Sequence, residues 1–217
     1  MSTTAKTIID NATVQLLDPN NLRWTRAELL SWLNDAQKTL VGALPEATAS
    51  IGLVTTVSGV KQALPSDGWC LLSVNRNMGT SGTTSGTPVL EVTRENLTRQ
   101  NPTWSTDTAA SAARLYFYTP LQKNVFWVYP PADSSANVLE ISYSKVPVDL
   151  VLETDTIAMS DIYKPALLDY VLFKACSKDA EYAPGAELAK NYLASFTSFT
   201  SATKAGADTI DKTEDKV

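Results

Sequence analysis

The stretch from Ser160 to Cys176, SDIYKPALLDYVLFKAC, decides how the rest of the chain has to fold. From Ala166 to Cys176 nearly every residue is apolar, whichever side of a helix it faces. A helix that is apolar all round is normally buried all round, and about 11 residues are too few to cross a membrane. Ser160 is a suitable N-cap, and Asp161 suits the positive end of the helix dipole. The stretch therefore predicts a core helix that needs several partners.

Three neighbouring segments have the periodicity of partner helices. After Pro184 and Gly185, apolar residues recur at spacings of three and four as far as Phe199. Near the start, residues 3–17 carry one apolar stripe, and a second helix is expected from Thr25 to about Val41. Thr25 and Glu28 have the T-x-x-E spacing of a capping box. The fold class predicted is α+β, with an antiparallel four-helix bundle made from the N- and C-terminal helix pairs.

The middle of the chain has the character of an antiparallel β domain inserted between the two helix pairs. Runs of strand length lie between turn signals at residues 50–57, 61–64, 69–75, 115–118, 125–129 and 138–146. In the last run Leu139, Ile141 and Tyr143 alternate with polar residues, which predicts one buried and one wet face. A short helix is expected at 94–100. The predicted parts are residues 1–46 and 151–203 for the bundle, 47–150 for the β domain and 204–217 for a flexible tail.

Composition excludes several classes of function. Histidine is absent from the 217 residues, which removes the commonest general base and metal ligand. The net charge of −5 argues against affinity for a phosphate backbone. Cys70 and Cys176 have no metal-ligand spacing, and Cys176 is expected in the core. Met1 to Asp10 does not resemble a signal peptide, so a soluble protein made in a cytoplasm, without cofactor or metal, is expected.

The β region admits three chemical interpretations. The glycines from Gly79 to Gly86 lack the Lys-Ser/Thr ending of a phosphate loop, so a flexible hairpin tip is favoured. Glu91, Glu95 and Glu140 are the candidate acids for a two-carboxylate hydrolase, against the simpler interpretation of surface carboxylates. A cluster of aromatic residues is read as core, with a carbohydrate- or ligand-binding face as the alternative function. It comprises Tyr116, Phe117, Tyr118, Phe126, Trp127 and Tyr129.

Four segments, read together in order, resemble a known family. They are WTRAELLSWLNDAQ from Trp24, KQALP with LLSVNRNM, FWVYPP with LEISYSKVP, and DIYKPALLDYVLFKACSKDAEY from Asp161. The chain is similar to the head-to-tail adaptor (connector) proteins of tailed bacteriophages, including the tail-tubular or gatekeeper adaptors of short-tailed phages. The likeness spans roughly Trp24 to Phe199, and its last segment is the most specific.

The resemblance implies a virion structural protein at the head-to-tail junction, without enzymatic activity. Such adaptors form a ring, usually a dodecamer, between the portal protein and the tail or nozzle proteins. DNA passes through the lumen without specific binding, and no membrane is involved. A C-terminal extension commonly reaches the portal.

On this basis three surfaces are assigned to partners. The charged tail is expected to bind the portal, and the Gly/Ser/Thr-rich loop to contact the tail proteins. The ring interface is expected on polar helix faces. The assigned residues are Lys204, Asp208, Asp211, Lys212, Glu214 and Asp215 for the portal; Thr80, Ser81, Gly82 and Thr83 for the tail; and Arg26, Lys38, Lys164, Lys178 and Asp179 for the ring.

Overall fold

The chain divides into two compact units that differ in secondary structure. The computed structural model describes residues 3–135, 137–178 and 183–214. One unit combines residues 1–47 with 147–217, and the other comprises residues 48–146. The described residues form five α-helices and two four-stranded sheets, so the fold is mixed α+β.

The helical unit contains α1 (Ala5–Gln15), α2 (Arg26–Ala43), α4 (Lys164–Lys178) and α5 (Ala183–Glu214). The predicted capping box is confirmed, because the Thr25 hydroxyl accepts the Glu28 N–H and the Glu28 carboxylate accepts the Thr25 N–H. Pro45 follows α2 and opens a short 3₁₀ helix, Pro45–Thr48. The start of α2 therefore follows from local sequence chemistry.

Helix α4 is the central element of this unit. Its residues Val171, Leu172 and Ala175 are completely buried, and Leu168 and Tyr170 pack at the edge of the same core. The indole N–H of Trp24 donates to the Ala175 carbonyl at 3.0 Å. The prediction of a core helix that needs several partners is confirmed, and so is the burial of Cys176.

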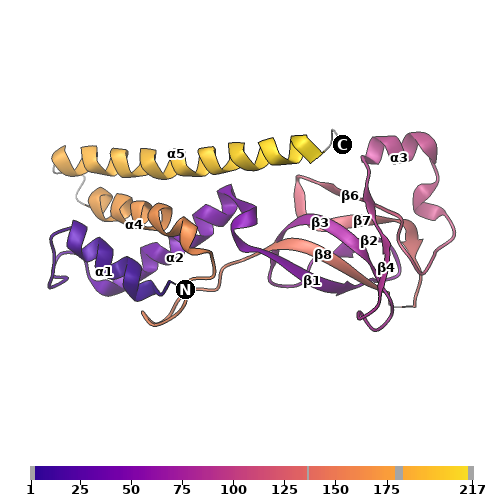
Figure 1. Cartoon of the computed structure of the whole chain (residues 1–217), viewed down its shortest axis with the longest axis horizontal. Helices are drawn as coiled ribbons and strands as arrows, with labels where there is room; N and C mark the ends of the chain where they lie inside the picture. The colour runs from indigo at the N-terminus through magenta and orange to yellow at the C-terminus, as the bar shows by residue number, and fades with distance from the viewer. Residues whose placement is uncertain (1–2, 136, 179–182, 215–217) are drawn as a thin grey trace. The chain divides into compact units, whose positions relative to one another are not determined.

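The predicted four-helix bundle is wrong. Helix α4 lies between α5 on one side and α1 with α2 on the other, so the helices form layers (Figure 1). Helix α5 packs mainly against α4 through a narrow stripe that includes Ala189, Phe196 and Thr200. Such a stripe is wide enough to pack against one neighbouring helix, whereas each helix of a four-helix bundle packs against two. Helix α5, with 32 residues, is also about twice as long as α4, which has 15.

The end of α5 differs from the sequence-based expectation. A flexible segment was expected from Lys204, but the helix continues to Glu214. Gly206 is the only glycine from Lys204 onward and no proline follows it, so no strong helix breaker interrupts the segment. Residues 215–217 lie outside the described part of the chain.

The β unit contains two four-stranded sheets. The first has the order β1 (Ala49–Thr55), β8 (Val138–Lys145), β3 (Gly68–Met78) and β4 (Ser85–Pro88). The second has the order β2 (Gly59–Ala63), β7 (Gln122–Ala132), β6 (Leu115–Thr119) and β5 (Leu90–Glu91). All neighbours are antiparallel except β5 and β6. The six predicted strands are confirmed, and β4 and β5 were not predicted.

The sheets share a sandwich core, and the second sheet also packs on its outer face. Leu139 and Ile141 of β8 meet Phe126 and Val128 of β7 in this core, as the alternation in β8 predicted. On the other face of the second sheet, Phe117 packs with Trp104 and with Leu97. Leu97 belongs to α3 (Arg94–Gln100), the short helix that the sequence predicted.

Candidate interaction surfaces

Arg26 joins three elements of the helical unit. Its guanidinium donates to both carboxylate oxygens of Glu153, at 2.7 and 2.6 Å, and to Asp10 at 2.7 Å. Helix α1 supplies Asp10, the first turn of α2 supplies Arg26, and the segment before α4 supplies Glu153. Paired, forked contacts of this kind are the strongest ion pairs that an arginine makes. Arg26 therefore has an internal structural role, and its assignment to the ring interface stays a prediction.

The charges of this cluster shift the pKa of each member. The hydrogen bond from Arg26 lowers the pKa of Glu153, although partial burial opposes it. Hydrogen bonds from Lys6 and then Arg26 lower the pKa of Asp10. The hydrogen bond to Glu153 raises the pKa of Arg26 most, and the hydrogen bond to Asp10 raises it further. All three groups are therefore held in their charged forms.

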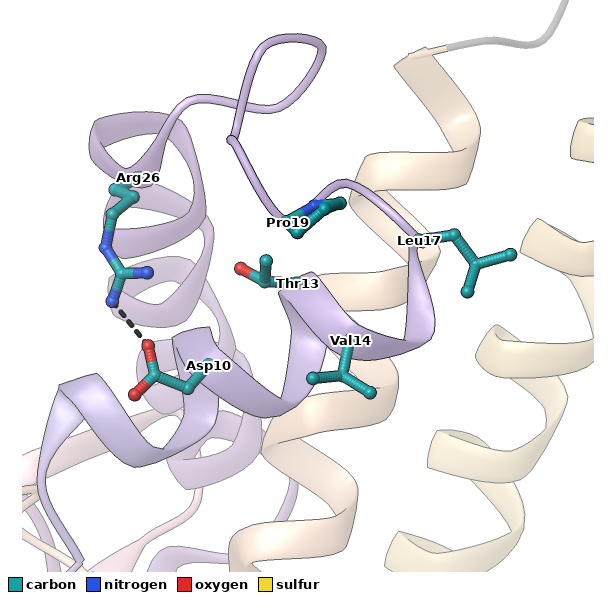
Figure 2. A pocket seen from close by; sticks show the side chains of 6 residues that line it. All are labelled: Asp10, Thr13, Val14, Leu17, Pro19 and Arg26. Atoms are coloured by element: carbon teal, nitrogen blue, oxygen red, sulfur yellow. Dashed lines mark hydrogen bonds and ion pairs between the residues drawn. The ribbon is translucent and has the colours of Figure 1, made fainter.

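An apolar hollow lies beside this cluster, at the end of α1 (Figure 2). It measures about 650 Å³, and its wall includes Val14, Leu17 and Pro19. Figure 2 shows the Asp10–Arg26 pair on one side of the hollow and Leu17 on the other. Leu17 is 86% exposed and has a φ of 54°, a left-handed conformation that is unfavourable for leucine.

The turn after Leu17 is fixed by hydrogen bonds. The carboxylate of Asp18 accepts the N–H groups of Leu22, Arg23 and Trp24 at 2.9 to 3.1 Å. Desolvation opposes their effect, but together these donors lower the pKa of Asp18. The exposed Leu17 therefore sits on an ordered turn.

The other residues assigned to the ring interface are dispersed. Lys38 pairs with Asp149 at 2.6 Å, and Lys178 with Glu28 at 2.6 Å. Lys164 opens α4, and Asp179 lies outside the described residues. Arg26 and Lys38 belong to α2, and Lys164 and Lys178 lie at the two ends of α4.

The residues assigned to the portal fall on the last part of α5. Lys204 is exposed, and the positions of Asp208, Asp211, Lys212 and Glu214 belong to the same helix. Asp215 lies outside the described residues. The last buried side chain among those described on this helix is Thr200, four residues before Lys204.

The residues assigned to the tail form the tip of the β3–β4 hairpin. The Gly79 N–H donates to the Thr84 carbonyl at 3.1 Å, and the hydroxyls of Ser81 and Thr83 are 2.7 Å apart. Gly82 has a φ of 71°, which suits glycine. The sequence predicted a flexible loop as far as Pro88, but Ser85–Pro88 pairs with β3 as strand β4.

The aromatic cluster is part of the fold. Tyr116, Phe117 and Phe126 are buried. Phe117 stacks on the half-buried Trp127 at 5.3 Å, and Trp104 covers its edge at 5.2 Å. The predicted core role is therefore confirmed for these rings, and no specific observation favours the carbohydrate-binding alternative.

The three candidate acids lie on separate elements. Glu91 accepts the Tyr116 hydroxyl at 3.1 Å, and Glu140 pairs with Arg76 at 3.3 Å. Glu95 is exposed in the first turn of α3. Among the residues that the structure describes, no contact joins two of these acids and no group of His, Cys, Asp and Glu side chains suits a metal ion.

Sequence reasoning missed two of these features. The partners of Arg26 are 16 and 127 residues away in the chain, so no local spacing indicates the ion-pair cluster. The exposed Leu17 was also missed, because it was treated only as the end of the first predicted helix. Its position directly before the turn-forming Asp18-Pro19-Asn20-Asn21 segment was the available signal.

Comparison with known proteins gives one family. A search of curated proteins found no match. In the part of the chain that the structure covers, no helix has both the length and the apolar character needed to cross a membrane. The family model described as SU10 adaptor protein matches residues 3–213. The chain therefore belongs to the SU10 adaptor protein family and is a structural adaptor protein of a bacteriophage.

Proposed function

We propose that this adaptor forms a ring between the portal and the tail of the virion, and that DNA passes through the ring. The observation that carries the proposal is the family match, which spans residues 3–213 and so includes both units. The tail-tubular or gatekeeper subtype, the dodecameric ring and a role without catalysis belong to the same proposal.

The last part of α5 is proposed as the portal-binding segment. Asp208 is four residues after Lys204, three before Asp211 and four before Lys212, so the four sequence positions share one side of a helix. The described side chains just before them leave the core after Thr200. A charged helical segment is suited to binding a surface of complementary charge.

The ring contact is proposed on the polar faces that carry Arg26, Lys38, Lys164 and Lys178. A closed ring needs two different, complementary surfaces on each copy. The ion pairs of Lys38 and Lys178 are exposed, and exposed pairs contribute little to stability. These lysines can therefore exchange an internal partner for one on the neighbouring copy at small cost.

The charge of the chain supports passage of DNA without retention. A net charge of −5 on each copy makes a ring strongly acidic. An acidic lumen repels the phosphate backbone, which favours sliding over binding. Acidic residues are therefore proposed to face the lumen, and a lumen lined with Lys and Arg would contradict this.

One deletion and one triple substitution test the two partner assignments. A chain without residues 204–217 is expected to lose portal binding and to retain binding to tail proteins. A chain in which Thr80, Ser81 and Thr83 are replaced by Gly is expected to show the reverse. Each variant is the control of the other, and binding is measured by co-sedimentation with purified portal or tail protein. Full portal binding by the truncated chain would reject the α5 assignment.

A further inference from the structure

Three of the four sheet edges in the β unit have features that prevent pairing with another chain. Natural proteins protect edges with short strands, proline, bulges or lysine. Strand β4 has four residues, ends at Pro88 and has a register shift against β3. Strand β2 carries Lys61 beside its own register shift, and β5 has two residues.

The fourth edge, β1, has none of these protections. Its seven residues, ASIGLVT, contain no charge and no proline, and they pair with β8 in uninterrupted register. Ile51 is 69% exposed and Leu53 is 52% exposed, both on the outer face of the first sheet, and the Cδ1 of Leu53 lies beside Gly82 of the β3–β4 hairpin. No other described strand pairs with β1. This edge therefore presents both apolar side chains and free backbone groups.

The register identifies which backbone groups are free. The Thr56 N–H donates to the Asn137 carbonyl at 2.7 Å, and this pair continues the β1–β8 register. In an antiparallel ladder, alternate residues bond the same neighbour. The even-numbered residues of β1 therefore bond β8, and Ile51 and Leu53 direct their N–H and C=O groups to the open edge.

We propose that β1 pairs with β1 of a second copy of this chain, antiparallel and centred on Gly52. In this register Ile51 lies opposite Leu53 of the other copy, so the free backbone groups meet and the exposed apolar side chains cover each other. Pairing at an edge needs a second unprotected edge. Among the described strands only β1 has one, so β1 of another copy is the partner strand that fits. The outer neighbours of β1 on β8, Ser142 and Glu140, are polar and do not compete for this contact.

This pairing goes beyond the proposed ring. A two-fold contact closes with two copies, whereas a ring needs head-to-tail contacts. The pairing therefore describes the free adaptor before it meets the portal. It shields an edge that would otherwise promote aggregation.

The test uses the full-length free chain in sedimentation equilibrium with amide hydrogen exchange. We expect a reversible dimer, with the Ile51 and Leu53 amides protected in the dimer and exchanging on dilution. Ile51→Lys should weaken dimerisation at least about tenfold, since each Ile51 contact occurs twice in the dimer. Leu121→Lys is the matched control, because Leu121 is 92% exposed in the turn between β6 and β7. It should leave the dissociation constant unchanged.

Three results would overturn the proposal. One is a monomer at all concentrations with both amides unprotected. The second is a dimer in which these amides still exchange freely, because its contact would lie elsewhere. The third is protection of the two amides only after another virion protein is added, because the occupant would then be that protein. The exchange measurement needs no variant, so it remains decisive if Ile51→Lys fails to fold.

Discussion

Replacing Phe196 with Ala tests the layered arrangement of the helical unit. Phe196 is 5% exposed, and its ring lies 5.3 Å from the ring of Tyr170 on α4 at an interplanar angle of 61°. Removal of a core phenylalanine costs about 3–5 kcal/mol. Because α5 packs mainly against α4, we expect the lower end, about 3 kcal/mol. The edge-to-face pair with Tyr170 should supply about 0.5–1.5 kcal/mol of this.

The assay is denaturant unfolding, monitored by the circular dichroism signal of the helices. It is applied to two double-mutant cycles. Phe196→Ala with Tyr170→Ala should show a coupling of about 0.5–1.5 kcal/mol. Phe196→Ala with Ile9→Val on α1 should be additive within about 0.5 kcal/mol, because Ile9 lies beyond α4. Leu22→Ala, at an 83% exposed side chain, is the control and should change stability by less than about 0.5 kcal/mol.

The reasoning is refuted if Phe196 couples to Ile9 by more than about 1 kcal/mol, since direct contact between α5 and α1 would restore a bundle. It is also refuted if Phe196 and Tyr170 are additive.

Three further predictions concern single contacts. Thr25→Ala should lower the free energy of unfolding by about 1 kcal/mol in a denaturant titration, because it removes the cap of α2. Gly52→Ala should destabilise the β unit by about 1–3 kcal/mol in thermal unfolding, because the new Cβ would lie 2.7 Å from Cε1 of the buried Tyr143. The pKa of Glu153 is lowered in the folded state by Arg26, so the unfolded chain binds more protons in acid. Its contribution is present at neutral pH and is lost as the pH falls below about 4.3. Glu153→Gln should reduce this acid sensitivity in unfolding measured across pH, and an unchanged pH profile would contradict it.

Local chemistry made the helices and most strands predictable. The capping box at Thr25 and the apolar run of α4 act within a few residues, and the structure confirms both. The alternation in β8 likewise identified a strand with one face in a core. Strands β4 and β5 were not predicted because short segments such as SGTP carry no apolar pattern.

The arrangement of the helices and the contacts between distant residues were not predictable in the same way. One apolar segment and three amphipathic segments fit a bundle and a layered unit equally well, because periodicity identifies a buried face but not the element that covers it. The Arg26–Glu153 pair joins residues far apart in the chain, so its partners appear only once the fold is known. The length of α5 was underestimated because its last residues have few apolar side chains, although they are compatible with a helix.

Electron microscopy of the full-length chain mixed with purified portal tests the central claim most directly. The proposed function predicts closed rings of adaptor on the portal, with an open central channel. Adaptor copies that bind the portal without lateral contacts, or an adaptor that does not bind the portal at all, would contradict it.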